Sequence, residues 1–357
     1  MAITLDPSTG TVTTPTVTAD GTTAIIMPAG TTAQRPATPA AGMVRLNTTL
    51  GYPEWYNSNI ASWQSFGYAG VQRAIFGYGY VASGVSMTNL VSNTGVVSSD
   101  VTGVGTARWQ LAAAGYGGDK AIFGYGFTGS DVSITNLVSN TGVVATDTTG
   151  VGTAREGPSA VSYGGDKAIF GYGYKNSTSA FVSMTNLVSN AGVVATDTTG
   201  VGTNRTYLAA AKYGSDKAVF GYGYTGSIVS MTNLVSNAGI VASDTTGVGT
   251  ARYLLASAGY DGDKAIFGYG NTGSTVSTTN LVSNTGVVAT DTTGVGTARY
   301  GLAAAGFGGN KALFGYGTTG SLVSMTNLVS NAGVVASDTT GVGTARRYLA
   351  AASYSLS

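Results

Sequence analysis

Most of the chain consists of short apolar runs separated by turns rich in glycine, threonine and asparagine. One complete stretch reads KAIFGYG (264–270), STVSTTNLVSN (274–284), GVVATDTTGVGTAR (286–299) and YGLAAAGFGGN (300–310). Runs of this length that are rich in Val, Ile, Thr, Tyr and Phe and bounded by glycines predict β-strands. The pattern therefore predicts four short antiparallel strands in each such stretch.

The stretch recurs six times. The motif AIFGYG, or a close variant of it, begins at spacings of 47, 47, 50, 47 and 47 residues, and the longer spacing reflects an insertion near Lys175. The six motifs begin at Ala74, Ala121, Ala168, Ala218, Ala265 and Ala312. A period of this length is typical of propeller blades. The sequence predicts an all-β fold, a six-bladed β-propeller of four-stranded antiparallel blades.

The predicted ring needs a closing strand. The residues after the sixth GTAR motif, RYLAAASYSLS, match the fourth strand of the other copies, and they precede no further FGYG. We expect this last strand to lie beside Arg73–Tyr78. The alternative is that SWQSFGYAGVQ (62–72) supplies the missing strand. We expect the propeller to span residues 68–357.

Two further regions precede the repeats. Residues 1–29 are polar and rich in threonine, which predicts an extended arm, with plain disorder as the alternative. Residues 30–67 predict a small β-hairpin module, in which MVRLN and a strand carrying Trp55 and Tyr56 flank a turn near Leu50–Pro53. A lone hairpin is marginally stable in water, so we expect it to need a partner surface.

The hairpin region resembles a module of bacteriophage tail fibres and other virion fibres. The similarity rests on GTTAQRP (30–36), Gly42, Arg45, Asn47, Thr48, the run EWYN (54–57) and Trp63. The resemblance covers about a tenth of the chain and implies a structural role between a virion-anchoring end and a distal binding end. A generic N-terminal hairpin is the alternative.

The repeats also resemble the kelch family. GYG stands where that family has its double glycine, and NLVSNTG and GTAR follow in the family's order. An inserted tyrosine and a valine at the family's tryptophan position depart from the pattern. The resemblance implies kelch-like blades packed through Val, Phe and Tyr.

The copies differ mainly in two loops, one after FGYG and one after GTAR, and alternating strand directions place both on one side of the ring. Aromatic side chains beside polar ones suit sugar rings or protein patches. The candidate ligand-binding residues are Tyr80, Phe127, Tyr174 and Tyr224 from the first loop, and Trp109, Tyr253, Tyr300 and Tyr348 from the second, where Tyr207 also lies. The alternative is that several of them pack between blades.

Residues that recur in every copy are expected to have structural roles. The tyrosine of each FGYG should stack between blades, and the arginine that ends each GTAR should pair with a turn carbonyl or with the recurring aspartate. That aspartate, as in Asp100, should cap a turn.

Composition narrows the chemistry. The chain has no His and no Cys, so the commonest metal ligands and nucleophile–base pairs are missing. Asp131 and Glu156 are copy-specific acids in the variable loops, without forming a recognisable active site. A net charge of +1 gives no footprint for nucleic acid or for an anionic membrane. We expect no enzyme activity, cofactor, metal or membrane insertion.

Together these features predict a phage virion fibre or adhesin that recognises a host surface glycan or protein. We expect the N-terminal arm to bind other virion subunits, the chain to form a homo-oligomer (a trimer by resemblance), and synthesis in the host cytoplasm without a signal peptide. The alternative is a purely structural head or tail decoration protein, followed by a polysaccharide-degrading enzyme.

Overall fold

The computed structural model describes residues 27–48, 52–58, 62–65 and 72–355. The predicted arm, residues 1–29, lies almost wholly outside these ranges. The chain divides into two compact units, Met1–Tyr68 and Ala69–Ser357. In the described residues, regular structure is almost entirely strand, as expected for an all-β protein.

The N-terminal unit is a four-stranded sheet in the order β1-β2-β3-β4, and this corrects the expectation of a hairpin. Its elements are β1 (Ala29–Gly30), the 3-10 helix η1 (Thr32–Gln34), β2 (Val44–Asn47), β3 (Tyr52–Asn57) and β4 (Ser62–Ser65). Strand β4 pairs with β3, and Trp63 lies opposite Tyr56 with ring centroids 5.6 Å apart. SWQS therefore belongs to this unit and does not close the repeats. The added strands supply the partner surface that a lone hairpin lacks.

A buried polar group joins the strands of this unit. Glu54 is 1% exposed and accepts hydrogen bonds from Arg35 Nη2 at 2.6 Å and from Asn47 Nδ2 at 3.1 Å. Arg45 donates to the carbonyls of Gln34 and Thr31. Three of the residues on which the fibre resemblance rests, Arg45, Asn47 and Glu54, are thus buried in the interior of the unit.

The C-terminal unit contains six three-stranded antiparallel sheets. Each has a short first strand from the end of one repeat, a middle strand that starts the next, and a third strand. The first strands are β7 (Ala112–Tyr116), β10 (Ser159–Tyr163), β13 (Ala209–Tyr213), β16 (Ala256–Tyr260), β19 (Ala303–Phe307) and β22 (Ala350–Ser355). The middle strands are β8 (Lys120–Gly124), β11 (Lys167–Lys175), β14 (Lys217–Tyr224), β17 (Lys264–Asn271), β20 (Lys311–Gly315) and β5 (Gln72–Tyr80). The third strands are β9 (Thr135–Val138), β12 (Ala180–Val188), β15 (Ile228–Val235), β18 (Thr275–Val282), β21 (Thr326–Val329) and β6 (Gly84–Val91), and the 3-10 helix η2 (Asn176–Thr178) precedes β12.

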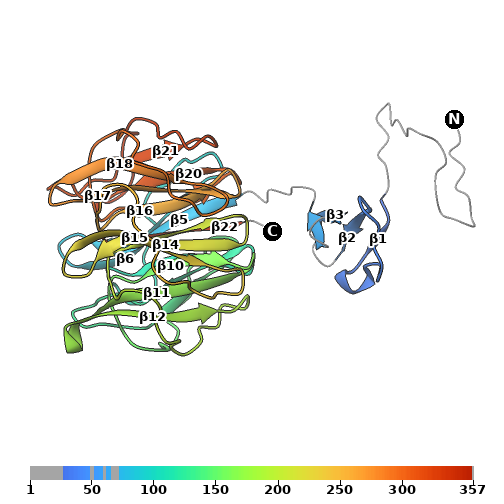
Figure 1. Cartoon of the computed structure of the whole chain (residues 1–357), viewed down its shortest axis with the longest axis horizontal. Coiled ribbons are helices and arrows are strands. Elements are labelled where there is room, and N and C mark those ends of the chain that lie inside the picture. Colours follow the sequence, from blue (N-terminus) through green and yellow to red (C-terminus); the bar gives the residue numbers. More distant parts are fainter. Residues whose placement is uncertain (1–26, 49–51, 59–61, 66–71, 356–357) are drawn as a thin grey trace, which may run out of the picture. The chain divides into compact units, whose positions relative to one another are not determined.

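The six sheets follow one another in a closed cycle. Their first strands are neighbours in the order β7, β10, β13, β16, β19, β22 and again β7. The last strand, β22, pairs antiparallel with β5, so that Ala351 lies opposite Phe76 and Ser355 opposite Gln72. In Figure 1 the C-terminus lies beside these two strands. The expected closure by the C-terminal strand is confirmed.

The expectation of four continuous strands in each sheet is wrong. The segment 95–101 after β6 forms no continuous strand and meets β6 at the isolated bridges Val91↔Val97 and Thr88↔Val101, with one backbone hydrogen bond from Ser98 to the Leu90 carbonyl at 2.8 Å between them. Between these bridges the side chain of Asn89 donates from Nδ2 to the Ser98 carbonyl at 3.0 Å and to Asp100 Oδ1 at 2.9 Å. An asparagine side chain thus takes the place of backbone pairing, and the other repeats do the same.

The cores lie between adjacent sheets. Phe76, Phe123 and their counterparts are 0% exposed, and each packs edge-on against the FGYG tyrosine of a neighbouring sheet, as Tyr78 does with Phe123 at 5.1 Å. The expected stacking of these tyrosines between sheets is therefore confirmed. All six tyrosines also have a positive φ, for example 62° at Tyr78, at a register shift between Gly77 and Gly79. This strained conformation turns the tyrosine ring from its own strand into the neighbouring sheet.

Candidate functional site

One end of the six sheets carries the turns that join each first strand to its middle strand, and we name it the turn end. A cycle of six backbone hydrogen bonds links these turns. The donors and acceptors are Gly117 to Asp166, Gly164 to Asp216, Gly214 to Asp263, Asp261 to Asn310, Gly308 to Gln72, and Ser355 to Asp119. The SNAG turn of Asn190 lies at the same end, since its Nδ2 donates to Asp166 Oδ2 at 3.1 Å. The sequence places these near-invariant turns together, and the hydrogen bonds agree.

The opposite end carries the loops that follow FGYG and GTAR, and we name it the variable end. A second cycle of six backbone hydrogen bonds surrounds the axis here. It runs from Gln110 to Tyr348, Tyr348 to Gly301, Gly301 to Leu254, Leu254 to Tyr207, Tyr207 to Gly157, and Gly157 back to Gln110, at 2.7–3.1 Å. Each of these residues has a positive φ between 54° and 63°. The copies therefore share a backbone ring at this end while their side chains differ.

The two variable loops meet within each sheet. Isolated bridges join Trp109 to Phe127 and Tyr80 to Arg347. Tyr174, Tyr224, Tyr253 and Tyr300 pair in the same way with Glu156, Thr206, Asn271 and Thr318. The structure thus brings seven of the predicted residues to one rim, and Tyr348 follows Arg347 in the inner ring. All eight are half-buried.

Many of these aromatic rings contact one another. Tyr80, Trp109 and Phe127 form one edge-to-face row, with centroid separations of 5.1 and 5.2 Å. A second row runs Tyr174, Phe181, Tyr224, Tyr253 and Tyr207 at 5.2–6.3 Å. The same aromatic side chains therefore pack against one another and are partly exposed to solvent. Rows of half-exposed rings offer edges and partial faces for stacking to a ligand.

Sequence reasoning missed two members of this surface. Phe181 lies in β12, after the insertion, and joins Tyr174 to Tyr224. Arg347 places its guanidinium carbon 4.8 Å from the Tyr348 ring centroid and 5.6 Å from that of Tyr80. Both occupy loop positions that differ between copies, which is the signal by which they could have been found.

A copy-specific polar network lies beside the second aromatic row. Gln110 Nε2 donates to the Tyr207 hydroxyl at 2.9 Å, and this hydroxyl lies 3.4 Å from Glu156 Oε1. The carboxylate of Asp131 accepts hydrogen bonds at 2.7 Å from the backbone N–H and the side chain of Asn176. Burial raises the pKa of Glu156, and the charge of Asp131 adds to this effect. The structure therefore brings the two copy-specific acids into one electrostatic environment.

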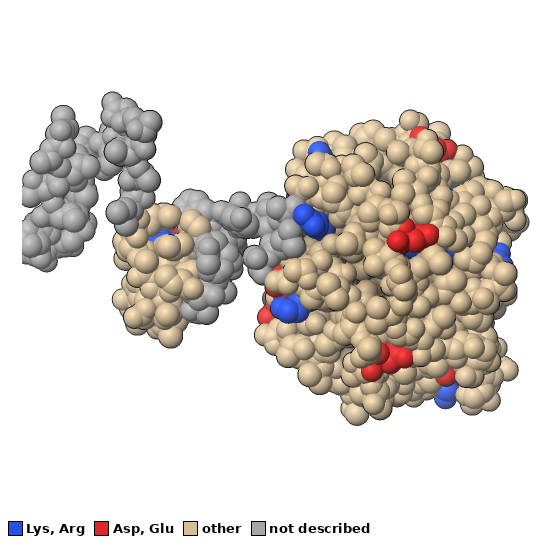
Figure 2. All heavy atoms as spheres, turned by 180° about the vertical axis from the view of Figure 1, so that it is seen from behind, with Lys and Arg blue, Asp and Glu red and all other residues tan. Residues whose placement is uncertain are grey.

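This network forms a hydrogen-bonding surface beside the aromatic side chains. Among the described residues, no group of three or more His, Cys, Asp or Glu side chains could hold a metal ion. The described part of the chain contains no helix long and apolar enough to cross a membrane. Figure 2 shows that charged side chains are few and scattered over the face of the larger unit that it draws. No family model matches the sequence, and the search of curated proteins finds no match.

Proposed function

We propose that the six sheets form a six-bladed β-propeller in which each three-stranded blade is completed by the bridged GVV segment at its outer edge. The cyclic order of the first strands and the pairing of β22 with β5 support this architecture. Both cycles of backbone hydrogen bonds fit it as well. The similarity of these blades to kelch blades rests only on the order of the sequence motifs in each repeat.

The proposed function is that of a phage virion fibre or adhesin, which recognises a host surface glycan or protein through the variable end. The observation that carries this proposal is the gathering of both variable loops, with their aromatic side chains, at one end of the sheets. Gln72, the first described residue of the C-terminal unit, belongs to the turn end through its carbonyl, opposite the variable loops.

The chemistry of the rim suits sugars. Half-buried tyrosine and tryptophan rings can stack on the apolar face of a sugar, while Gln110, Asn176 and the two acids can hydrogen-bond its hydroxyls. No catalytic role is proposed for this surface. Other virion subunits would bind the N-terminal region, and oligomerisation, as a trimer by resemblance, would add avidity to weak single sites.

A second candidate is a purely structural decoration protein of the phage head or tail. It is favoured by one exposed aliphatic side chain per repeat at the outer edge of the sheets. These side chains are Val96, Val143, Val193, Ile240, Val287 and Val334, and each is 65–69% exposed. A repeated apolar edge of this kind suits contacts with other virion proteins.

A binding experiment on the whole protein tests the proposal. Host cells and a glycan array are probed with the wild type and with a variant in which Tyr80, Tyr174 and Tyr224 are all replaced by serine. We expect wild-type binding and its loss in the variant. The matched control replaces Val143, Val193 and Val287 by serine at the outer edge. Binding retained in the tyrosine variant would contradict the proposed site, and absence of wild-type binding to host cells and glycans would favour the structural alternative.

A further inference from the structure

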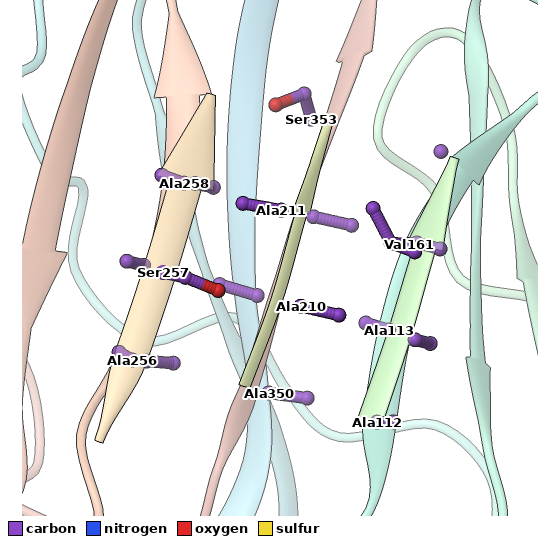
Figure 3. Close-up of a pocket in the computed structure, with 18 of the residues that line it drawn as sticks. Ala112, Ala113, Val161, Ala210, Ala211, Ala256, Ser257, Ala258, Ala350 and Ser353 are labelled. Atoms are coloured by element: carbon purple, nitrogen blue, oxygen red, sulfur yellow. The ribbon is translucent and has the colours of Figure 1, made fainter. Parts of the chain in front are cut away.

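The first strands of the six sheets line a cavity of about 380 Å³ that extends from the turn end to the variable end. Its volume falls within the range of about 300–1,000 Å³ that is typical of small-molecule sites. Alanine, serine and glycine residues dominate the wall, and Figure 3 shows Ala113, Ala210 and Ser257 on three of the strands. Small side chains leave the axis of the ring open.

One position of the wall differs sharply between the copies. The fourth residue of each first strand is half-buried, and its neighbours on either side in the strand are buried. This position holds Gly115, Ser162, Gly259, Gly306 and Ser353 in five strands, and Lys212 in β13. A lysine has therefore replaced a glycine or a serine on the wall of the cavity.

Open space and two serine hydroxyl groups surround Lys212 in the cavity. A Cβ placed on the adjacent Gly259 would lie 4.0 Å from Lys212 Cβ, so the missing side chain leaves room beside the lysine. In the cyclic order, β22 with Ser353 stands opposite β13. The hydroxyls of Ser162 and Ser353 donate to the carbonyls of Gly115 and Gly306 at 2.8 Å, which leaves their oxygen lone pairs as acceptors at the same level.

No ion pair joins Lys212 to any described residue, and the charge of Asp216 acts on it only from beyond ion-pair distance. Asp216, the acid nearest in sequence, instead binds Lys217 at 3.1 Å and Asn237 Nδ2 at 3.2 Å. No Asp or Glu belongs to the described lining of the cavity, whereas Lys120 and Lys311 do. Burial lowers the pKa of Lys212, and an anion beside it would offset that cost.

We propose that this cavity is a second binding site, which takes a small carboxylate-bearing sugar with its carboxylate on the Lys212 ammonium. One half-buried cation without an ion-pair partner matches the single charge of a carboxylate, whereas a phosphate monoester carries about 1.5 to 2 charges at neutral pH. The alanine walls suit the apolar face of a sugar ring, and the serine oxygens accept hydrogen bonds from its hydroxyls. Lys212 lies near the turn end of this cavity, beside Tyr213 and Lys217, whereas Gln110, Tyr207 and Tyr348 line it at the variable end.

Calorimetric titration of the full chain tests the proposal, with glucuronic acid and N-acetylneuraminic acid as probes and glucose and inorganic phosphate as comparisons. We expect binding of at least one sugar acid and none of glucose. Lys212→Ser places in β13 the residue that β10 and β22 carry, so the strand should fold, and we expect at least tenfold weaker binding. The control Lys167→Gln removes an exposed lysine outside the lining and should leave the affinity unchanged.

Three results would overturn the proposal. They are no binding of either sugar acid by the wild type, equal binding by Lys212→Ser, and binding of phosphate without binding of a sugar acid. Substitution of the rim tyrosines Tyr80, Tyr174 and Tyr224 should leave sugar-acid binding intact, so a failure here and a failure of the adhesin function are distinguishable. Circular dichroism of Lys212→Ser checks that the fold is retained.

Discussion

The guanidinium carbon of Arg155 lies 4.1 Å from the ring centroid of Tyr125, so a fully buried cation from one sheet rests on an aromatic ring of the next. The same arginine donates from Nε to the Tyr172 carbonyl at 2.7 Å and from Nη2 to Asn186 Oδ1 at 2.8 Å. The pair recurs in all six sheets. Each arginine therefore fixes both the inside of its own sheet and the contact with its neighbour.

Replacing this arginine should destabilise the ring. In Arg155→Met, the Tyr172 carbonyl and the Asn186 amide oxygen lose their buried donors, and the cation–π contact with Tyr125 is lost. We expect the free energy of unfolding to fall by roughly 2–4 kcal/mol, as measured by urea denaturation. The exposed Lys167→Gln serves as the control and should change it by less than about 0.5 kcal/mol. A stability of Arg155→Met equal to that of the wild type would show that the arginine network contributes nothing net.

Close packing between neighbouring sheets predicts a contrast between two glycines. A Cβ on Gly124 would lie 2.7 Å from Phe170 Cζ, whereas a Cβ on Gly259 meets its nearest atom at 3.4 Å, which is an ordinary contact. We expect Gly124→Ala to lower the stability by roughly 1–3 kcal/mol and Gly259→Ala to be nearly neutral. Thermal unfolding of the two variants side by side measures the difference. Equal midpoints would refute the tight contact between these sheets.

Ring closure depends on β22. A chain that ends at Arg347 loses β22 and its pairing with β5, together with the turn-end hydrogen bond from Ser355 to Asp119 and the variable-end hydrogen bond from Tyr348 to Gly301. The exposed edge of β5 then favours association with other chains. We expect a lower thermal midpoint and new oligomers in size-exclusion chromatography. An unchanged midpoint and elution volume would argue against closure by this strand.

The recurring aspartates predict loss of stability in acid. Burial alone would raise the pKa of Asp244, but hydrogen bonds from Thr203 and Asn233 and the charge of Arg205 together lower it below 3.8. A carboxyl whose pKa is lowered on folding stabilises the fold above its unfolded pKa, and this contribution disappears as the pH falls through the folded pKa. We expect Asp244→Asn to be less stable than the wild type at pH 7, with the difference shrinking below about pH 4.

Thermal unfolding of both proteins from pH 7 to pH 3 measures this effect. The six aspartates share this geometry, since each accepts hydrogen bonds from a threonine near the first strand and from an asparagine of the third strand, as Asp100 does with Thr344 and Asn89. The expected local turn cap is therefore replaced by a tie to the GTAR segment of the preceding repeat, and for Asp100 to that of the last repeat. A difference that is constant across the pH range would contradict the assignment.

The sequence by itself determined the repeat, three of the strands in each sheet and the order of the sheets. The spacing of AIFGYG sets the period, and the match of RYLAAASYSLS to earlier first strands predicts the partner of β5. The separation of invariant turns from variable loops also follows, because strands that alternate in direction place successive connections at opposite ends. These features are local or periodic, so the amino-acid sequence alone is enough to predict them.

Tertiary structure alone decided the rest. The outer segment failed to become a full strand because Asn89 and its counterparts insert their side chains where backbone pairs would form. The hairpin gained strands on both sides, because β1 pairs with β2 and β4 pairs with β3. Lys212 became a cavity residue because the pleat of β13 turns it toward the axis that five other strands also line. Such outcomes depend on side chains that the tertiary structure brings into contact. Residues far apart in sequence stabilise the protein only through the interactions that they form once they are in contact.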